Sequence, residues 1–300
     1  MVQLRAQIVV KDGKTPVIGF TLGTLWQQHM RGEQLLEAMW TRGCRSVEIH
    51  FHPYRDDFAD ALALARHAMD MGYALTVHAA TDGDFNAVHY QARPEPVMRA
   101  HRLLLDEVEN LAASYGQAVM INFHGGQGEG ERDALVEAVR QVVHQMAQWM
   151  EEDYPHVRGA VEILPHDPLY QRIGDREEDL LRITEGLDID RFGLCWDMGH
   201  LQRNRSLFQY GGPASEEFVR RVVHTHIHEV DAEHRDHCPL GRGVVSVRSD
   251  LERLVQRGYQ GVFNLELGFK EASLYGDPVE ELCRSAEALS SMLQSLRGRV

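Results

Sequence analysis

Side chains that bind metal ions are concentrated in the last third of the chain. The stretches FGLCWDMGH, VVHTHIHEVD, HRDHCPLGRG and VFNLEL lie between Phe192 and Glu266 and carry Asp, Glu and His residues at or just past short apolar runs. Glu162 has the same position relative to the apolar run of GAVEILP. Short apolar runs of this kind are typical of buried strands. The sequence therefore predicts that metal-binding side chains gather where strands end.

Four of these residues lie at the ends of four consecutive predicted strands: Glu162, Asp197, His226 and Glu266. Carboxylates brought together in one place repel one another strongly unless a cation lies between them. Three carboxylates and one imidazole suit Mn²⁺, Co²⁺, Mg²⁺ or Zn²⁺, and they differ from the thiolate ligands of a structural zinc site. We therefore expect one divalent metal ion with these four side chains as its ligands.

Three histidines of HTHIH alternate along one predicted strand, so they lie on the same face of that strand. His224 is expected deep in the fold and His228 near the following loop, where it can touch a substrate. His226 lies between them and is the best placed to bind a metal ion. Asp197 and His200 form a D-x-x-H pattern at a strand end, where the chain is expected to bend into a loop. We expect His200 to hydrogen-bond a ligand oxygen, with metal ligation as the alternative.

The elements that must position these residues alternate in type along the chain. The predicted strands cover residues 16–20, 46–50, 73–78, 118–124, 159–164, 192–196, 222–227 and 262–267. The predicted helices cover residues 33–40, 57–71, 96–115, 132–152, 177–185, 215–222, 249–257 and 278–296, and a short hairpin is expected at residues 3–10. Alternation of this kind favours a parallel sheet covered by helices. Eight repeats predict α/β architecture, a single (β/α)8 TIM barrel, with residues 1–300 as one domain.

The carboxyl ends of the strands in such a barrel meet at one rim. Further candidates for binding substrate or supporting the metal ligands therefore come to the same place: Glu48, His78, His124, His228 and His237. Glu48 has the alternative of staying in the barrel interior, paired with a histidine. His78 and His124 have the alternative of closing the rim without touching a metal ion.

Residues in the loops after the strands are candidates for substrate specificity. Trp26 follows the first strand, where its ring could stack on the apolar face of a sugar, with loop packing as the alternative. Arg235 and Lys270 follow the seventh and eighth strands. They could bind a carboxylate or phosphate, or lie in solvated loops.

Composition narrows the class of partner and the compartment. The chain has 31 basic and 45 acidic residues and a net charge of −14, which disfavours nucleic acid as a partner. Four cysteines without a C-x-x-C pair indicate a reducing, cytoplasmic compartment. The sequence contains neither a signal peptide nor an apolar stretch of about 18 residues, so we expect no membrane segment. A homo-oligomer is compatible with these features.

Several of these motifs together resemble those of the xylose isomerase-like barrel superfamily. They are Glu162 in VEILP, the WDMGH and HTHIH runs, PLGRG, and Glu266 in NLEL. The superfamily includes sugar isomerases and epimerases, inosose dehydratases and apurinic endonucleases of the endonuclease IV type. The resemblance extends from around Val17 to Glu266, and His78 and His124 resemble its histidines on the third and fourth strands.

The resemblance to the isomerase and epimerase branch implies a mechanism. The metal ion held by the four ligands would bind two neighbouring oxygens of an α-hydroxy carbonyl compound and stabilise the enediolate. Glu162 and Glu266 would lie on opposite sides of the substrate carbon as proton acceptor and donor. His200 would orient a substrate oxygen. The predicted function is a metal-dependent isomerase or epimerase acting on a small polyhydroxy substrate such as a sugar.

Two other branches supply alternative functions. An inosose dehydratase-like lyase would use the same enediolate to expel a β-hydroxyl group. An endonuclease IV-like phosphodiesterase would cleave abasic DNA with three zinc ions, and counterparts of its ligands are present in this chain. However, Asp236 directly precedes His237, whereas that branch has an Asp-x-His spacing. The net charge of −14 also disfavours a DNA substrate.

Overall fold

A computed structural model describes residues 16–29, 32–208 and 213–298. Eight parallel strands close into a barrel in the order β1-β10-β9-β8-β6-β4-β3-β2. The strands are β1 (Val17–Leu22), β2 (Ser46–Phe51), β3 (Ala74–Ala79), β4 (Val119–Phe123), β6 (Val157–Glu162), β8 (Phe192–Asp197), β9 (Val222–Ile227) and β10 (Val262–Leu265). The closed parallel barrel with flanking helices confirms the predicted fold class. The predicted hairpin at residues 3–10 lies outside the described residues.

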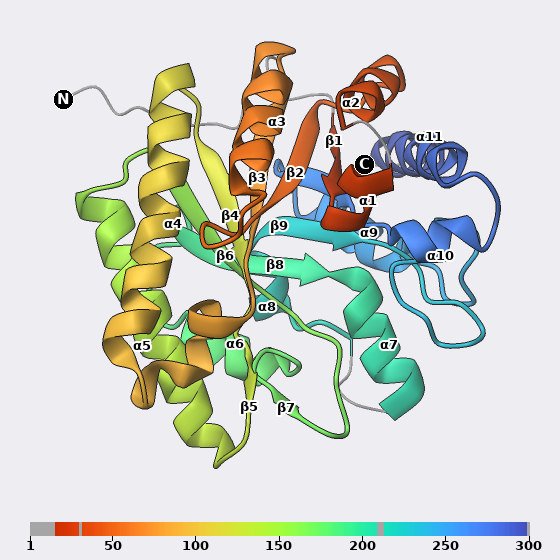
Figure 1. Ribbon diagram of the computed structural model, residues 1–300. Coiled ribbons are helices and arrows are strands. Elements are labelled where there is room, and N and C mark those ends of the chain that lie inside the picture. The colour runs from red at the N-terminus through yellow and green to blue at the C-terminus, as the bar shows by residue number, and fades with distance from the viewer. Residues whose placement is uncertain (1–15, 30–31, 209–212, 299–300) are drawn as a thin grey trace.

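Helices surround the barrel, with α4 and α5 on one side and α11 on the opposite side (Figure 1). Apolar residues at helical spacing turn one face of each long helix toward the strands, as Leu135, Val139 and Val142 do in α5. The helices are α1 (Thr24–His29), α2 (Gly32–Thr41), α3 (Phe58–Asp70), α4 (Pro94–Tyr115), α5 (Arg132–Glu152), α6 (Glu177–Ile183), α7 (Met198–Phe208), α8 (Glu216–Arg220), α9 (Arg248–Gln256), α10 (Phe269–Ser273) and α11 (Pro278–Arg297).

The segments after the strands contain more structure than the sequence predicts. The segment after β3 forms the short 3-10 helices η1 (Gly83–Phe85) and η2 (Ala87–Gln91). The strands β5 (Gln127–Gly128) and β7 (Gln171–Arg172) pair with each other outside the barrel. The sequence predicts a loop directly after Asp197, and this prediction is wrong because helix α7 begins at Met198. An oxygen of Asp197 accepts the backbone N–H of His200 at 2.6 Å, as an N-terminal capping residue does.

The barrel interior is polar toward the carboxyl ends of the strands. Parallel register places Thr21, Glu48 and Thr76 in one layer, and His50, His78 and Asn122 in a layer nearer the carboxyl ends. Residues on alternate positions of a barrel strand point inward, so these polar side chains share the interior. The larger apolar core lies between the strands and the helices. The polar side chains that could take part in a reaction therefore lie in the barrel interior near the carboxyl ends of the strands.

Candidate metal centre

The structure brings the four predicted metal ligands together at the carboxyl end of the barrel. Glu162 and Asp197 end β6 and β8, His226 lies in β9, and Glu266 directly follows β10. One ligand atom from each of the four lies within 4.8 Å of the others. The imidazole Nδ1 of His226 faces all three carboxylates, at 2.9 Å from Glu266, 3.4 Å from Glu162 and 3.8 Å from Asp197.

The donor atoms of this group fit a bound cation. All four residues are buried. Glu162 Oε1, Glu266 Oε2 and His226 Nδ1 are buried atoms that find no hydrogen-bond partner within the described part of the chain. Buried polar atoms normally have such a partner. Three carboxylates and one imidazole that converge with such unpartnered atoms are the ligands expected around a hard or borderline divalent ion.

The imidazole of His226 offsets part of the carboxylate charge of the group when no cation is bound. Burial alone would lower the pKa of His226, but Cys195, Glu266 and Glu48 raise it well above its usual value. Burial alone would raise the pKa of Glu266, yet His226 and His237 hold it well below its usual range. A protonated His226 therefore offsets carboxylate charge in the metal-free protein. A metal ion would take the place of that proton.

Glu48 contacts His226 on the side of the ring away from the candidate metal ligands. It is absent from the cavity lining that the described residues form. Its carboxylate is fully buried and accepts a hydrogen bond from Thr21 at 3.1 Å. It also lies 2.8 Å from Nε2 of His224 and 2.9 Å from Nε2 of His226. Of the two predicted placements of Glu48, the structure supports the barrel interior, paired with histidine.

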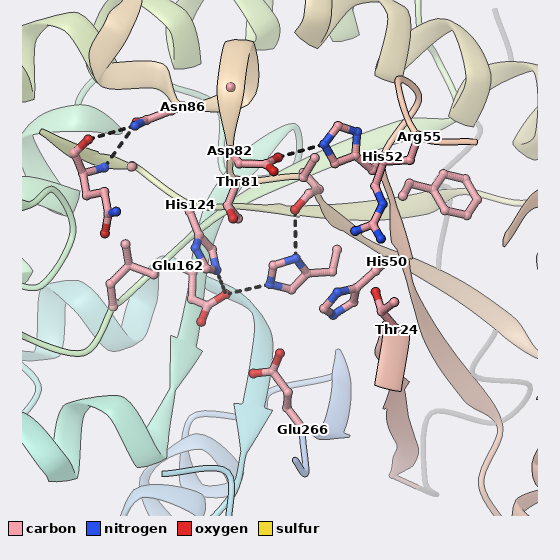
Figure 2. Close-up of a pocket in the computed structure, with 18 of the residues that line it drawn as sticks. Thr24, His50, His52, Arg55, Thr81, Asp82, Asn86, His124, Glu162 and Glu266 are labelled. Carbon is pink, nitrogen blue, oxygen red and sulfur yellow. Dashed lines mark hydrogen bonds and ion pairs between the residues drawn. The ribbon is translucent and has the colours of Figure 1, made fainter. Parts of the chain in front are cut away.

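A second group of potential ligands shares Glu162 with the first. His78, His124 and Glu162 each offer an atom within 4.8 Å of the others. Nδ1 of His78 bonds the backbone oxygen of Ala79 at 2.9 Å, so it carries the proton and leaves Nε2 directed toward Glu162 at 3.7 Å. Nε2 of His124 lies 3.3 Å from the same carboxylate, which also accepts a hydrogen bond from the Asn122 amide. Figure 2 shows the His124 ring directed toward the Glu162 carboxylate at the edge of the cavity.

A third group shares Asp197 and contains three histidines: His200, His228 and His237. The Nδ1 of His200 donates to the carbonyl oxygen of Ile163 at 3.2 Å, and its Nε2 has no hydrogen-bond partner in the described part of the chain. The Nδ1 of His228 accepts the backbone N–H of His237 at 2.8 Å, so its Nε2 must carry the proton and donate to Asp197 at 3.1 Å. His228 therefore orients Asp197, while His200 and His237 have the atoms that can reach a ligand.

A cavity of about 840 Å³ opens above these groups. Residues of the three groups form its floor: His78, His124, Glu162, His200, His237 and Glu266. His237 adopts a positive φ of 55°, a backbone conformation that residues other than glycine seldom adopt. That conformation lets the loop after β9 return its imidazole to the site, 3.5 Å from Glu266. The cavity is large enough for a small polyhydroxy compound.

Three predicted substrate-binding residues lie elsewhere. Trp26 is buried in loop packing, where its indole N–H donates to the backbone oxygen of Leu267 at 2.7 Å. Arg235 bonds Asp231 of its own loop at 2.7 Å, and Lys270 is exposed on α10. None of the three lines the cavity in the described structure. These placements agree with the alternatives predicted for them, loop packing for Trp26 and loop positions away from the cavity for Arg235 and Lys270, and contact with a substrate stays a prediction.

His50 is a site residue to which the sequence reasoning gave no role. Its ring stacks on His78 at 4.4 Å, and it groups with His78 and Glu266 as a further set of potential ligands. Burial lowers its pKa to about 3, so the imidazole is neutral. The signal was present in SVEIHF, because alternation places His50 on the same inward face as Glu48.

A family model described as a xylose isomerase-like TIM barrel matches residues 36–292. The chain therefore belongs to this family. The uncharacterized protein MJ1311 of Methanocaldococcus jannaschii is 26% identical over 156 residues. That match spans 50% of this chain and 43% of the archaeal protein, so the chain matches less than half the length of that relative.

Solved structures with the same fold include several epimerases. A D-tagatose 3-epimerase-like protein has 18% identity and a TM-score of 0.68, covering 94% of this chain and 99% of its own. An L-ribulose 3-epimerase has 16% identity and a TM-score of 0.71, covering 95% and 97%. The 3-keto-D-glucoside 4-epimerase YcjR of E. coli has 15% identity and a TM-score of 0.64, covering 95% and 100%. At these identities the likeness concerns the fold.

No helix in the described ranges combines the length and apolar character needed to cross a membrane.

Proposed function

We propose that this protein is a metal-dependent sugar isomerase or epimerase that moves a proton at a carbon beside a carbonyl group. The observation that carries the proposal is the placement of Glu162 and Glu266. Glu162 ends β6 and Glu266 directly follows β10, and β8 and β9 lie between these two strands in the barrel. Both glutamates line the cavity. Both carboxylates also face Nδ1 of His226. A substrate carbon held between them has a base on either side.

Some residues of the site would bind the metal ion and the substrate, and two of them would also transfer the proton. A divalent ion held by Glu162, Asp197, His226 and Glu266 would polarise substrate oxygens and stabilise negative charge on them. Surrounding imidazoles hold the pKa of Glu162 and Glu266 low against the effect of burial, so each is ionised and can accept a proton. Transfer from one face and return to the other inverts the carbon, whereas return to the neighbouring carbon interconverts an aldose and a ketose. His200 can orient a substrate oxygen through its free Nε2.

Solvent deuterium exchange tests the proposal directly. The Mn²⁺-loaded protein is incubated in D2O with a panel of ketoses and aldoses, and carbon-bound deuterium is measured by NMR. We expect exchange together with an epimer or isomer, whereas exchange with loss of water would identify the lyase alternative. Glu266→Gln should abolish exchange while Glu217→Gln, on the exposed face of α8, should not. Metal content is measured for each variant, and full exchange in a metal-loaded Glu266→Gln protein would remove Glu266 as acid or base.

A second candidate function is phosphodiester hydrolysis of abasic DNA. The observation favouring it is that three groups of potential ligands lie side by side and share Glu162 and Asp197. Such an arrangement could hold several ions, as a metal-dependent nuclease requires. The net charge of −14 opposes it, because duplex binding depends on neutralising phosphates. Three tightly bound zinc ions and cleavage of an abasic duplex would replace the first proposal with this one.

A further inference from the structure

The cavity extends beyond the metal centre to the loop between β2 and α3. Arg55 belongs to this loop and lines the cavity together with Thr24, His50 and Thr81. Figure 2 shows the Arg55 side chain running from the loop toward His50 and Thr24. The metal-binding carboxylates Glu162 and Glu266 lie on the other side of His50 in the same view. The cavity thus has a carboxylate-lined end and an end with a cationic side chain.

The terminal nitrogens of Arg55 are available to a ligand. Within residues 16–29, 32–208 and 213–298, its one contact is that of Nε with Asp57 at 3.4 Å. The other arginine that lines the cavity is occupied, because Arg172 donates to the backbone oxygen of Pro165 at 3.2 Å and to Asp167 at 3.4 Å. A guanidinium group presents a planar fork of donors that matches a carboxylate or phosphate.

Neutral polar side chains also line the same end of the cavity. His50 Nε2 is a buried atom without a hydrogen-bond partner among the residues described, and Thr24 lies beside His50 in Figure 2. The nearby acid Asp82 is paired with His52 at 2.8 Å. Asp57 also lines this end of the cavity but contacts Arg55 through Nε, so an anionic group placed here can meet the terminal guanidinium nitrogens and neutral polar groups, whereas at the other end it would meet Glu162 and Glu266.

We propose that the substrate carries an anionic group, a carboxylate or phosphate, at the end remote from the reacting carbons, and that Arg55 binds this group. The inference rests on the proposed function, because it takes the metal end of the cavity as the reacting end. A charge-assisted pair of hydrogen bonds from one guanidinium gives both affinity and orientation. It holds the polyhydroxy chain along the cavity, with the carbon beside its carbonyl between Glu162 and Glu266.

Matched pairs of probe compounds test the inference by binding alone. Isothermal titration of the Mn²⁺-loaded protein compares D-ribulose 5-phosphate with D-ribulose, and D-tagaturonate with D-tagatose. We expect one anionic member to bind at least about tenfold more tightly than its neutral partner, as hydrogen bonds to a charged group allow. Arg55→Gln should abolish that preference without changing affinity for the neutral sugar, and Arg55→Lys should keep part of it. Lys270→Gln, an exposed cation on α10, is the matched control and should change neither.

The pair with the larger Arg55-dependent preference identifies phosphate or carboxylate as the group. Equal affinity for both members of both pairs, or a preference retained in Arg55→Gln, would overturn the inference. If neutral sugars exchange deuterium and the preference is absent, this inference fails while the proposed function stands. If the preference depends on Arg55 but deuterium exchange is absent with every sugar and every probe, the anion site stands and the proposed function fails.

Discussion

The carboxylate of Glu48 lies 2.9 Å from Nε2 of His226 in the closed interior of the barrel. Both side chains are fully buried. His226 thus presents Nε2 to Glu48 and Nδ1 to the three carboxylates of the candidate metal centre. A carboxylate behind a metal-binding imidazole fixes the orientation of the ring and raises its basicity. Glu48 therefore supports the centre from beneath, while remaining out of reach of a substrate.

Glu48→Gln should weaken metal binding, because the amide keeps the shape of the side chain but loses its charge. Removing such a supporting carboxylate typically costs about 10- to 100-fold in metal affinity. The measurement is competition for Mn²⁺ against a chelator. Glu109→Gln is the control, since Glu109 pairs with His156 at 2.7 Å near the surface, away from the cavity. Equal affinity in Glu48→Gln and the control would show that Glu48 does not support the ligand.

The number of bound metal ions depends on which of the groups of potential ligands are occupied. We expect one tightly held equivalent of Mn²⁺ or Zn²⁺ after metal removal, reloading and gel filtration. His226→Ala should lose it, because His226 faces all three carboxylates. His237→Ala should keep it, since that side chain belongs to the third group. Elemental analysis gives the count, and three equivalents in the unmodified protein would contradict the single-metal proposal.

The backbone at Gly199, in the WDMGH run, lies so close to the His228 ring that there is no room for a side chain. A Cβ at this position would lie 2.1 Å from the His228 ring, which cannot move away because it bonds both Asp197 and the backbone of His237. Gly199→Ala should therefore destabilise the protein by about 1–3 kcal/mol, as overpacking does. Thermal unfolding measures the change, with Gly298→Ala as a control whose Cβ would meet its nearest atom at 3.5 Å. An unchanged or higher Tm in Gly199→Ala would refute the argument.

The parts of the site on strands were predictable from the sequence, whereas the parts outside the strands were predicted only where a motif marked them, as for His200 and His237. Glu162 and Asp197 end parallel strands of a barrel, so counting strands was enough to bring them together. Trp26 could not be placed in this way, because its indole is held by Leu267, which is distant in sequence and follows the last strand. Arg55 was likewise missed, since no periodicity indicates which loop side chain turns into a cavity. Contacts between loops, unlike strand alternation, leave no local pattern.

Lowering the pH should destabilise the folded protein because His101 would have to be protonated. His101 lies in α4 and is not one of the candidate metal ligands. The ring is buried and its Nδ1 donates to the backbone oxygen of Val97 at 2.8 Å. Burial lowers its pKa to about 4, whereas the unfolded chain has a value of about 6.5. Between these values the unfolded chain binds a proton that the folded protein excludes. The contribution of His101 to the free energy of unfolding is therefore fully present above about pH 6.5. It decreases as the pH falls toward 4, by about 3 kcal/mol in total.

His101→Phe should remove this part of the pH dependence, because a phenyl ring fills a similar space between Phe85 and Phe123 and does not titrate. The measurement is urea unfolding of the metal-free protein at intervals between pH 4 and 7, so that loss of a bound ion does not contribute. The slope of the free energy of unfolding against pH should fall by up to about 1.4 kcal/mol per pH unit, which corresponds to one proton. Ser114→Phe, at an exposed position of the same helix, adds and removes no titratable group and should leave the slope unchanged. A slope in His101→Phe equal to that of the unmodified protein would mean that the proton is taken up elsewhere.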